Sequence, residues 1–458
     1  MEYTPNILSI VPPLLALLFV LWKKQIVPAL LLGGLSGSFI LSGYDIGFFY
    51  HFLNKNLQIL GQRGNMELIL FSLLIGGLIK GMEKNGGFKG FISLLEKKKA
   101  GNSVRTAYGL TWLIGITLFL ENWSNILING TATGPIYKKL GISKAKLAYF
   151  IHTISINLVA LILINSWGAF YMTLLEGQNV DNSFFVILKS IPFNFYCIIS
   201  LIVVALAMIF NINLGPMKRY KDKEETEVEK TEKEEYVPPK KSVHLIMPLL
   251  VMIFTLIATL YITGEGSITS GSGTTAVFFA VITSIVVHFF YIRITEKVAF
   301  QDNLKTIYNG VGELIPLGVL LVLALTLGRI CMEIGTGVYI ANFTDQNLPL
   351  FIIPAVFFLL SCIISFATGT SYGTFSIMIP LAVPLALVTG IDLPLIFAAC
   401  ISGGVFGDNC SPISDTSIVT GLAAKIDVVD HIKTQIPYAL VSASIATVLF
   451  VIAGLIMI

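Results

Sequence analysis

The densest polar stretch of this sequence is GDNCSPISDTS at 407–417, inside an otherwise apolar segment. It holds two carboxylates, Asp408 and Asp415, which share one face if the stretch is helical because they are seven residues apart. An unpaired carboxylate in lipid costs at least ~2.5–3.5 kcal/mol, so its neighbours must supply hydrogen bonds or a bound cation. Hard oxygen ligands suit a small cation such as Na⁺, and a buried carboxyl group can hold a proton instead.

One Asp can therefore alternate between Na⁺ and H⁺, with Asp408 and Asp415 as the predicted Na⁺ ligands. The candidate ion- or proton-binding residues of this stretch are Asp408, Asn409, Ser411, Ser414, Asp415 and Thr416. The alternative is that Asp, Asn and Ser only cap a helix at a break. Two Asp residues exceed what capping requires.

A second cluster, TGTSYGT at 368–374, supplies hydroxyl groups. Its small residues let the backbone turn tightly and approach a ligand, although they also suit a simple packed turn. The candidate substrate-binding residues here are Thr368, Thr370, Ser371 and Thr374. Residues 369–373 also fit the GxSxG nucleophile elbow, with His152 and His288 as the embedded candidate bases. That pattern requires a preceding strand, and an apolar helix is predicted here, so a membrane serine hydrolase is disfavoured.

The first part of the chain carries a related cluster, ENWSN at 121–125. Glu121 is a further candidate carrier of a proton or cation, although it could instead pair with Arg105. The other candidate substrate-binding residues are Asn122, Ser124, Asn125, Asn165 and Ser166. We interpret His152 as a hydrogen-bonded structural residue rather than a proton relay.

Composition indicates which elements must position these residues. The chain has 458 residues, of which 55% are hydrophobic and 12% charged, about half the usual charged share of a soluble domain. Sixteen of the 57 charged residues lie within 217–241 alone. This excludes an ordinary soluble enzyme and a nucleic-acid-binding domain, and predicts an all-α polytopic membrane protein. The five Cys show no CxxC spacing and are typical of packing residues.

Apolar runs long enough to cross a bilayer define the expected spans. They are 6–22, 26–42, 66–82, 147–175, 185–211, 243–263, 274–292, 311–330 and 437–458. The segments 104–137, 349–390 and 394–424 are interrupted near their middles by Gly, Pro, Ser, Thr or Asn. We expect re-entrant helical hairpins in the first two, and broken transmembrane helices in 394–424 and 147–175.

A charged linker, 213–242, divides the chain into two halves, 1–212 and 243–458. The halves match weakly at an offset of about 240–250, which places 104–137 opposite 349–390. A rival register at offset 287 aligns Glu121 with Asp408. In the first register each half crosses the membrane five times, and an odd number of crossings makes the repeats inverted.

The distribution of basic residues favours the first register. It places 26 of the 30 Lys and Arg on the inner side, including those of a cytoplasmic linker, as the positive-inside rule requires. Both termini are then expected outside a bacterial-type inner membrane. Irregular backbone at membrane depth must line a cavity or be buried in protein, so the tips and breaks predict a site near the midplane.

Two motifs resemble those of a known family. GDNCSPISDT at 407–416 resembles the GD-x-x-SP-x-SDT signature of the NhaC-type sodium/proton antiporter family, within the ion transporter superfamily, and FATGTSYGT at 366–374 resembles its FATGTSxGT segment. The resemblance covers the second half, whereas the first half matches mainly in hydropathy and length. It implies inverted repeats, a mobile transport domain, a scaffold domain and an elevator-type homodimer.

The site residues that the resemblance implies are Thr370, Ser371, Thr374, Asp408, Ser411, Ser414, Asp415 and Thr416, whereas Asn409 stands at a variable position. The expected function is Na⁺/H⁺ antiport by alternating access, with Na⁺ and H⁺ as partners and no cofactor. The alternative is a Na⁺- or H⁺-coupled carrier of a small carboxylate or amino acid. A channel is disfavoured because no ring of repeated filter residues is visible, and no metal cluster or nucleophile–base pair indicates an enzyme.

Overall fold

The computed structural model describes residues 3–97, 103–220, 241–347 and 349–457. Every regular element in these ranges is a helix, which confirms the all-α prediction for the described residues. Most of the predicted linker lies outside them, apart from a 3₁₀-helix at Gly215–Lys218.

The α-helices follow the chain in two series. The first is α1 (Val11–Lys23), α2 (Ile26–Leu41), α3 (Phe48–Leu60), α4 (Arg63–Lys84), α5 (Gly87–Lys97), α6 (Val104–Thr117), α7 (Asn122–Lys139), α8 (Lys144–Leu161), α9 (Ser166–Glu176), α10 (Ser183–Ser190) and α11 (Phe195–Ile209). The second is α12 (Val243–Thr263), α13 (Gly273–Thr295), α14 (Phe300–Glu313), α15 (Ile315–Glu333), α16 (Thr336–Asn347), α17 (Ile353–Thr368), α18 (Ser371–Thr389), α19 (Leu393–Cys410), α20 (Asp415–Ala424) and α21 (Val428–Met457).

Eight helices in the described ranges are long and apolar enough to cross a membrane, or ten if each of two bent pairs counts as one span. This agrees with a multi-pass membrane protein. Large apolar side chains also remain exposed on the outer helices, such as Phe254 of α12 at 76%. Such a surface suits lipid as its solvent.

Two features differ from the spans expected from sequence. The predicted span 185–211 is bent by 46° between the α10 segment and α11, where Pro192 and Asn194 interrupt the helix. The sequence reasoning also assigned no helix to α3, α5, α14 or α16. These four have 11–14 residues, fewer than a bilayer requires, so a search for spans passes over them.

Interrupted helix pairs stand where the hairpins and broken helices were expected. The re-entrant course of the hairpins stays a prediction, since Leu350–Thr368 and Ser371–Thr389 are each long enough to cross a membrane. Helices α6 and α7 form one antiparallel pair around residues 118–121, and α17 and α18 form another around 369–370. The broken helices are α8–α9, bent by 42° at the break, and α19–α20, interrupted at 411–414.

Helix starts recur at a constant spacing along the chain. Helices α7 and α18 begin at Asn122 and Ser371, 249 residues apart, and α9 and α20 begin at Ser166 and Asp415, again 249 apart. The same spacing separates the starts of α6 and α17, and of α8 and α19. It agrees with the first register and not with the offset of 287. The inverted relation of the halves stays a prediction.

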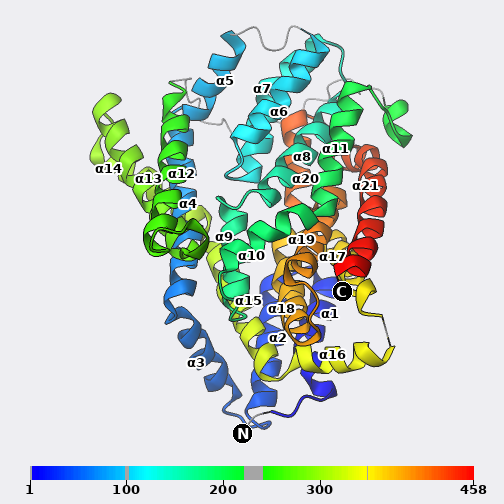
Figure 1. Cartoon of the computed structure of the whole chain (residues 1–458). Helices are drawn as coiled ribbons and strands as arrows, with labels where there is room; N and C mark the ends of the chain where they lie inside the picture. The colour runs from blue at the N-terminus through cyan, green and yellow to red at the C-terminus, as the bar shows by residue number, and fades with distance from the viewer. Residues whose placement is uncertain (1–2, 98–102, 221–240, 348, 458) are drawn as a thin grey trace.

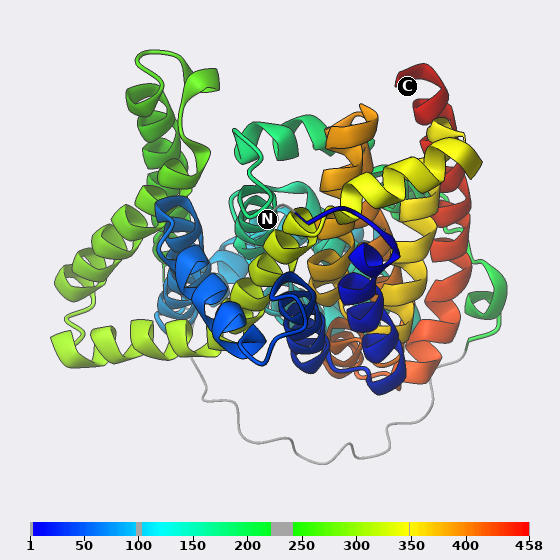
Figure 2. The same ribbon diagram turned by 90° about the horizontal axis from the view of Figure 1, so that it is seen from below.

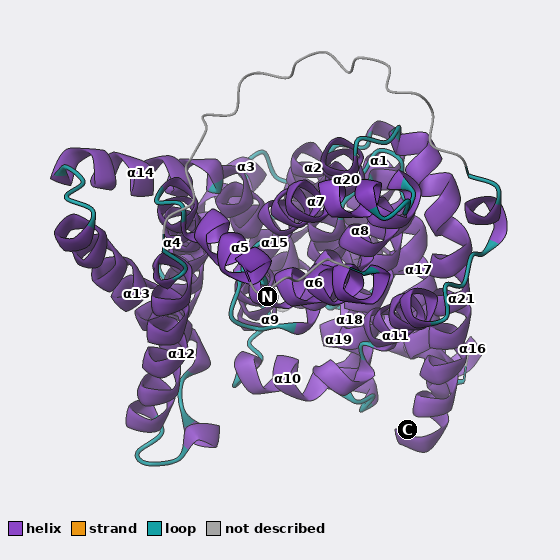
Figure 3. Cartoon of the chain, turned by 90° about the horizontal axis from the view of Figure 1, so that it is seen from above, coloured by secondary structure: helices purple, strands orange, loops and turns teal. Residues whose placement is uncertain are grey.

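Figure 1 shows how these elements are arranged. Helix α4 stands with α12, α13 and α14 on one side of the molecule, and α21 lies on the opposite side, as Figure 3 also shows from above. The hairpin α6–α7 occupies the upper half of Figure 1 and α17–α18 the lower half. Seen from below in Figure 2, α12 and α13 project away from the remaining helices.

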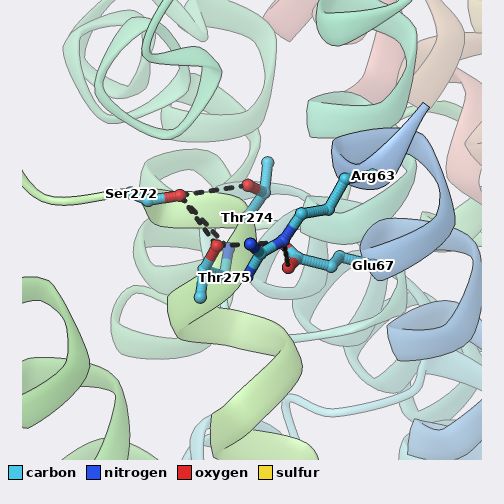
Figure 4. A network of polar contacts seen from close by, with 5 residues as sticks. All are labelled: Arg63, Glu67, Ser272, Thr274 and Thr275. Carbon is cyan, nitrogen blue, oxygen red and sulfur yellow. Dashed lines mark hydrogen bonds and ion pairs between the residues drawn. The ribbon is translucent and has the colours of Figure 1, made fainter. Parts of the chain in front are cut away.

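Contacts along α4 hold this side together. The Arg63 guanidinium pairs with Glu67 at 2.8 Å, and the Thr275 hydroxyl at the start of α13 donates to the other Glu67 oxygen at 2.8 Å (Figure 4). Further along, a Cβ at Gly310 of α14 would lie 2.2 Å from the Gly76 carbonyl oxygen, so only glycine permits this close approach.

Candidate ion-binding site

Both hairpin tips and both helix breaks meet inside the helical bundle. Helix α7 packs against α20, and α18 packs against α9, so each hairpin contacts the broken helix of the other half. Within the second half, α18 also packs along α19. The sequence clusters at 121–125, 165–166, 368–374 and 407–417 are therefore brought to one region.

Asp408 lies at its centre. It sits in the last turn of α19 and is 3% exposed. The Ser371 hydroxyl at the start of α18 donates to Asp408 Oδ2 at 2.6 Å. The hydroxyls of Ser414 and Thr416, beyond the break, both reach Oδ1, the second at 3.2 Å. Three hydroxyls from two separate helices therefore surround one carboxylate.

The close fit between tip and break depends on Gly369. Its φ of +68° lies in the left-handed region, and a Cβ there would stand 2.8 Å from the backbone of Ile413. Glycine alone therefore lets the tip rest on the break and deliver Ser371 to Asp408. The other tip hydroxyls bond backbone: Thr370 caps α18, accepting from Gly373, and those of Thr368 and Thr374 donate to carbonyls.

The break itself is shaped by short polar side chains. Ser411 ends α19 with extended backbone, and its hydroxyl accepts from the Ile413 N–H at 3.4 Å. Asn409 points away from Asp408, and its amide donates to the Tyr196 hydroxyl at 3.2 Å. The Asp415 carboxylate accepts from the Thr416 backbone N–H at 2.6 Å, and its surface remains exposed.

The first-half tip presents Glu121 as the N-cap of α7. Its carboxylate accepts from the backbone N–H groups of Trp123 at 2.9 Å and Ser124 at 2.7 Å. Asn122 is buried beside it, and Asn125 donates to the Gly115 carbonyl at 2.8 Å. Glu121 is the charged residue of this cluster. Its carboxylate caps α7, and among the ion pairs of the described residues it has no bond to Arg105.

The first-half break is closed by amide and hydroxyl groups. Asn165 caps α9 by accepting from the Gly168 N–H at 2.9 Å, while its amide donates to the carbonyls of Val159 and Phe119 at 2.8 and 3.2 Å. The second of these bonds ties the break to the first hairpin tip. Ser166 accepts a long 3.4 Å hydrogen bond from Tyr372 of the other half.

The electrostatic balance of this region is negative. The charges of Glu121 and Asp408 both act on Asp415, and the indole of Trp123 contacts the Asp415 carboxylate. Among the ion pairs found in the described ranges, none involves these three carboxylates. Among the described residues, no group of three His, Cys, Asp or Glu side chains is arranged as a metal centre.

Sequence reasoning missed a polar network behind Asp408. His152 Nε2 lies 3.1 Å from the Thr416 hydroxyl, and His152 Nδ1 lies 2.9 Å from His431 Nε2. Gln435 of α21 contacts both His152 and Asn409. The i, i+4 spacing of His431 and Gln435, which places both on one face of α21, is the signal that could have revealed it.

Comparisons with known proteins show which family the chain resembles. The model of the Na⁺/H⁺ antiporter family matches residues 158–455. An uncharacterized protein of Haemophilus influenzae is 28% identical over 99% of this chain and 92% of its own length. The malate-2H⁺/Na⁺-lactate antiporter of Bacillus subtilis is 35% identical over 23% of each chain.

A solved structure shares the fold. MtrF of Neisseria gonorrhoeae, described within a class of antimetabolite efflux pumps, superposes with a TM-score of 0.64 over 90% of this chain and 85% of its own, at 17% identity. At that identity the likeness concerns the fold alone.

Proposed function

Because the chain belongs to the Na⁺/H⁺ antiporter family, we propose that it exchanges Na⁺ for H⁺ across the membrane, with Asp408 holding each ion in turn. Family membership makes it a secondary transporter and not an enzyme. Na⁺ is then transported cargo, and the proposal includes no resident cofactor.

The environment of Asp408 is the observation that supports this assignment. A buried carboxylate without a basic partner is costly unless hydrogen bonds, a proton or a cation compensate it. The hydroxyls of Ser371, Ser414 and Thr416 donate to it here. A hydroxyl also has two lone pairs, so after rotation the same groups can face a cation. One set of oxygens therefore serves the empty and the Na⁺-bound carboxylate.

In this proposal, Asp415 and Glu121 are negative charges at the more exposed edge of the site. Asp415 is exposed and Glu121 is partly exposed, whereas Asp408 is buried behind them. Their negative charge raises the local concentration of cations, which favours entry of Na⁺ over that of an anion. Alternating access would come from elevator-type motion within a homodimer, with both termini outside and the linker cytoplasmic.

The direct test is a pair of substitutions on α19. In proteoliposomes containing a pH-sensitive dye, Asp408→Asn is expected to abolish Na⁺-dependent proton flux because Asn neither titrates nor carries charge. Asp392→Asn is the matched control: Asp392 caps the start of the same helix by accepting from Leu395 at 2.9 Å, and Asn is an equally good cap. Full flux in Asp408→Asn would refute the assignment.

The second candidate is a Na⁺- or H⁺-coupled carrier of a small carboxylate or amino acid. The organic cargo named for the Bacillus subtilis relative favours it. Trp167 Nε1 and Asn157 Oδ1, which flank the first break, are also buried without hydrogen-bond partners and could serve a solute. A screen of labelled lactate, malate and amino acids in the same proteoliposomes, with and without a Na⁺ gradient, distinguishes the two.

A further inference from the structure

The network behind Asp408 links the last helix of the chain to the candidate site. His152 of α8 stands between Thr416 of α20 and two side chains of α21, His431 and Gln435. His152, Thr416, His431 and Gln435 are each no more than 1% exposed. Hydrogen bonds within the protein must therefore satisfy most of the donors and acceptors of this group.

Gln435 fixes the direction of these hydrogen bonds. Its side-chain nitrogen lies 2.8 Å from the backbone carbonyl oxygen of Asn409. A carbonyl oxygen only accepts, so the atom facing it must be the NH₂ group of Gln435. That NH₂ group also lies 3.2 Å from His152 Nδ1. An amide nitrogen only donates, so His152 Nδ1 is the acceptor.

The tautomers of both histidines follow from this. With Nδ1 accepting, a neutral His152 carries its proton on Nε2 and donates to the Thr416 hydroxyl at 3.1 Å. His431 Nε2, 2.9 Å from His152 Nδ1, must also donate, because two bare nitrogens cannot bond. This leaves His431 Nδ1 bare, which agrees with its lack of a partner.

Thr416 continues the series of hydrogen-bond donors toward the Asp408 carboxylate. Since its oxygen accepts from His152, its own proton points to Ser414 at 2.7 Å or to Asp408 Oδ1 at 3.2 Å. Ser414 in turn donates to the same Asp408 oxygen. A chain of donors thus begins on α21 and ends on Asp408.

We propose that His152 is a positioning residue that directs the Thr416 hydroxyl proton toward Asp408 and so favours the ionised, Na⁺-accepting carboxylate over the protonated one. This rests on the proposed exchange of Na⁺ and H⁺ at Asp408. His152 acts by its fixed donor and acceptor ends, without gaining or losing a proton. The titratable groups that face His152 are His431 of α21, in direct contact, and Asp408, which it reaches through Thr416.

The substitution His152→Gln tests whether the direction of the hydrogen bonds at position 152 matters independently of whether its side chain can gain or lose a proton. The introduced amide would present its NH₂ group to Thr416 and its carbonyl oxygen to Gln435, the same polarity as the observed tautomer, yet it does not titrate. His152→Leu removes both ends. The matched control is Ser442→Ala, a buried polar residue of α21 whose hydroxyl donates to the Tyr438 carbonyl and takes no part in the chain of donors.

The assay is Na⁺-dependent proton flux in proteoliposomes, measured against Na⁺ concentration at several pH values. His152→Leu is expected to raise the KM for Na⁺ about threefold to tenfold at acid pH, where protons compete, with kcat at saturating Na⁺ unchanged. His152→Gln and Ser442→Ala should keep the original KM and pH profile. Combining His152→Leu with Thr416→Val should raise KM no further than Thr416→Val alone.

The outcomes are distinct. His152→Gln behaving as His152→Leu, or additive effects in the double variant, would overturn the role of His152. If His152→Leu does not fold, Gln435→Leu, which removes the orienting donor, must raise KM in the same pH-dependent way or the proposal fails. Absence of Na⁺-dependent proton flux in the unmodified protein would instead contradict the proposed function itself.

Discussion

Removal of the Ser371 hydroxyl tests the candidate site most sharply, because Ser371 is the one hydroxyl found on Asp408 Oδ2. It donates at 2.6 Å, whereas Ser414 and Thr416 share Oδ1. Ser371→Ala should therefore leave one carboxylate oxygen without a side-chain donor and Na⁺ without one oxygen ligand. A hydrogen bond to a charged group contributes about 1.5–3 kcal/mol, so we expect the apparent affinity for Na⁺ to fall about tenfold to a hundredfold.

The matched control lies five residues along the same helix. Ser376 is equally buried, but its hydroxyl donates to the Tyr372 carbonyl and does not contact Asp408. Ser376→Ala should change the affinity by less than twofold. Both variants are compared by initial rates of Na⁺-dependent dye response in proteoliposomes, after size-exclusion chromatography shows that they fold. Equal affinities in the two variants would refute the view that Ser371 serves Asp408.

Three further predictions concern the frame around the site. Gly369→Ala and Gly390→Ala both place a Cβ on a residue with positive φ, but only the Cβ at position 369 would meet backbone atoms within 4 Å. Transport should therefore be lost in Gly369→Ala and kept in Gly390→Ala. Equal activities of the two variants would contradict the close packing of the second hairpin tip on the α19–α20 break. Asn165→Ala removes the α9 cap and two amide bonds, and should lower stability by about 1–2 kcal/mol in thermal unfolding of the purified protein, whereas an unchanged midpoint would rule out the capping role. A cysteine at the exposed position of Glu265 should react with an impermeant maleimide added outside, and one at the exposed position of Lys297 should react with the reagent added inside. The five native cysteines are buried and should not interfere. The reverse labelling pattern would overturn the predicted orientation.

Much of the site could be predicted because buried polar residues are costly in a membrane. The clusters around Glu121, Asn165, Ser371 and Asp408 stand out from apolar sequence for that reason, and the structure brings them together. Which residue of a cluster reaches Asp408 could not be predicted. Ser371 does so while Thr370 caps a helix, and that difference of one position depends on the turn at Gly369.

Helices that are apolar along their whole length could be predicted from hydropathy, whereas short helices and contacts between distant helices could not. Long apolar runs identified the long helices, although the expected spans 6–22 and 26–42 correspond to shorter apolar helices. The constant spacing of helix starts supports the chosen register. The short helices α3 and α14 escaped because their apolar residues cover one face only. His152 was expected to be hydrogen-bonded, but its partners could not be predicted, because His431 and Gln435 lie about 280 residues away and meet it only through the packing of α21 against α8.

The 249-residue spacing has an electrical consequence. The position equivalent to Asp408 in the first half is Val159, which is buried in α8 and can hold neither a proton nor a cation. The two halves thus provide equivalent backbone breaks, but of the two equivalent positions only Asp408 carries a carboxylate. Exchange through Asp408 alone would move one Na⁺ against one H⁺ in each cycle, with no net charge crossing the bilayer. Transport of this kind is electroneutral, so it should run at the same rate whether or not a membrane potential is imposed.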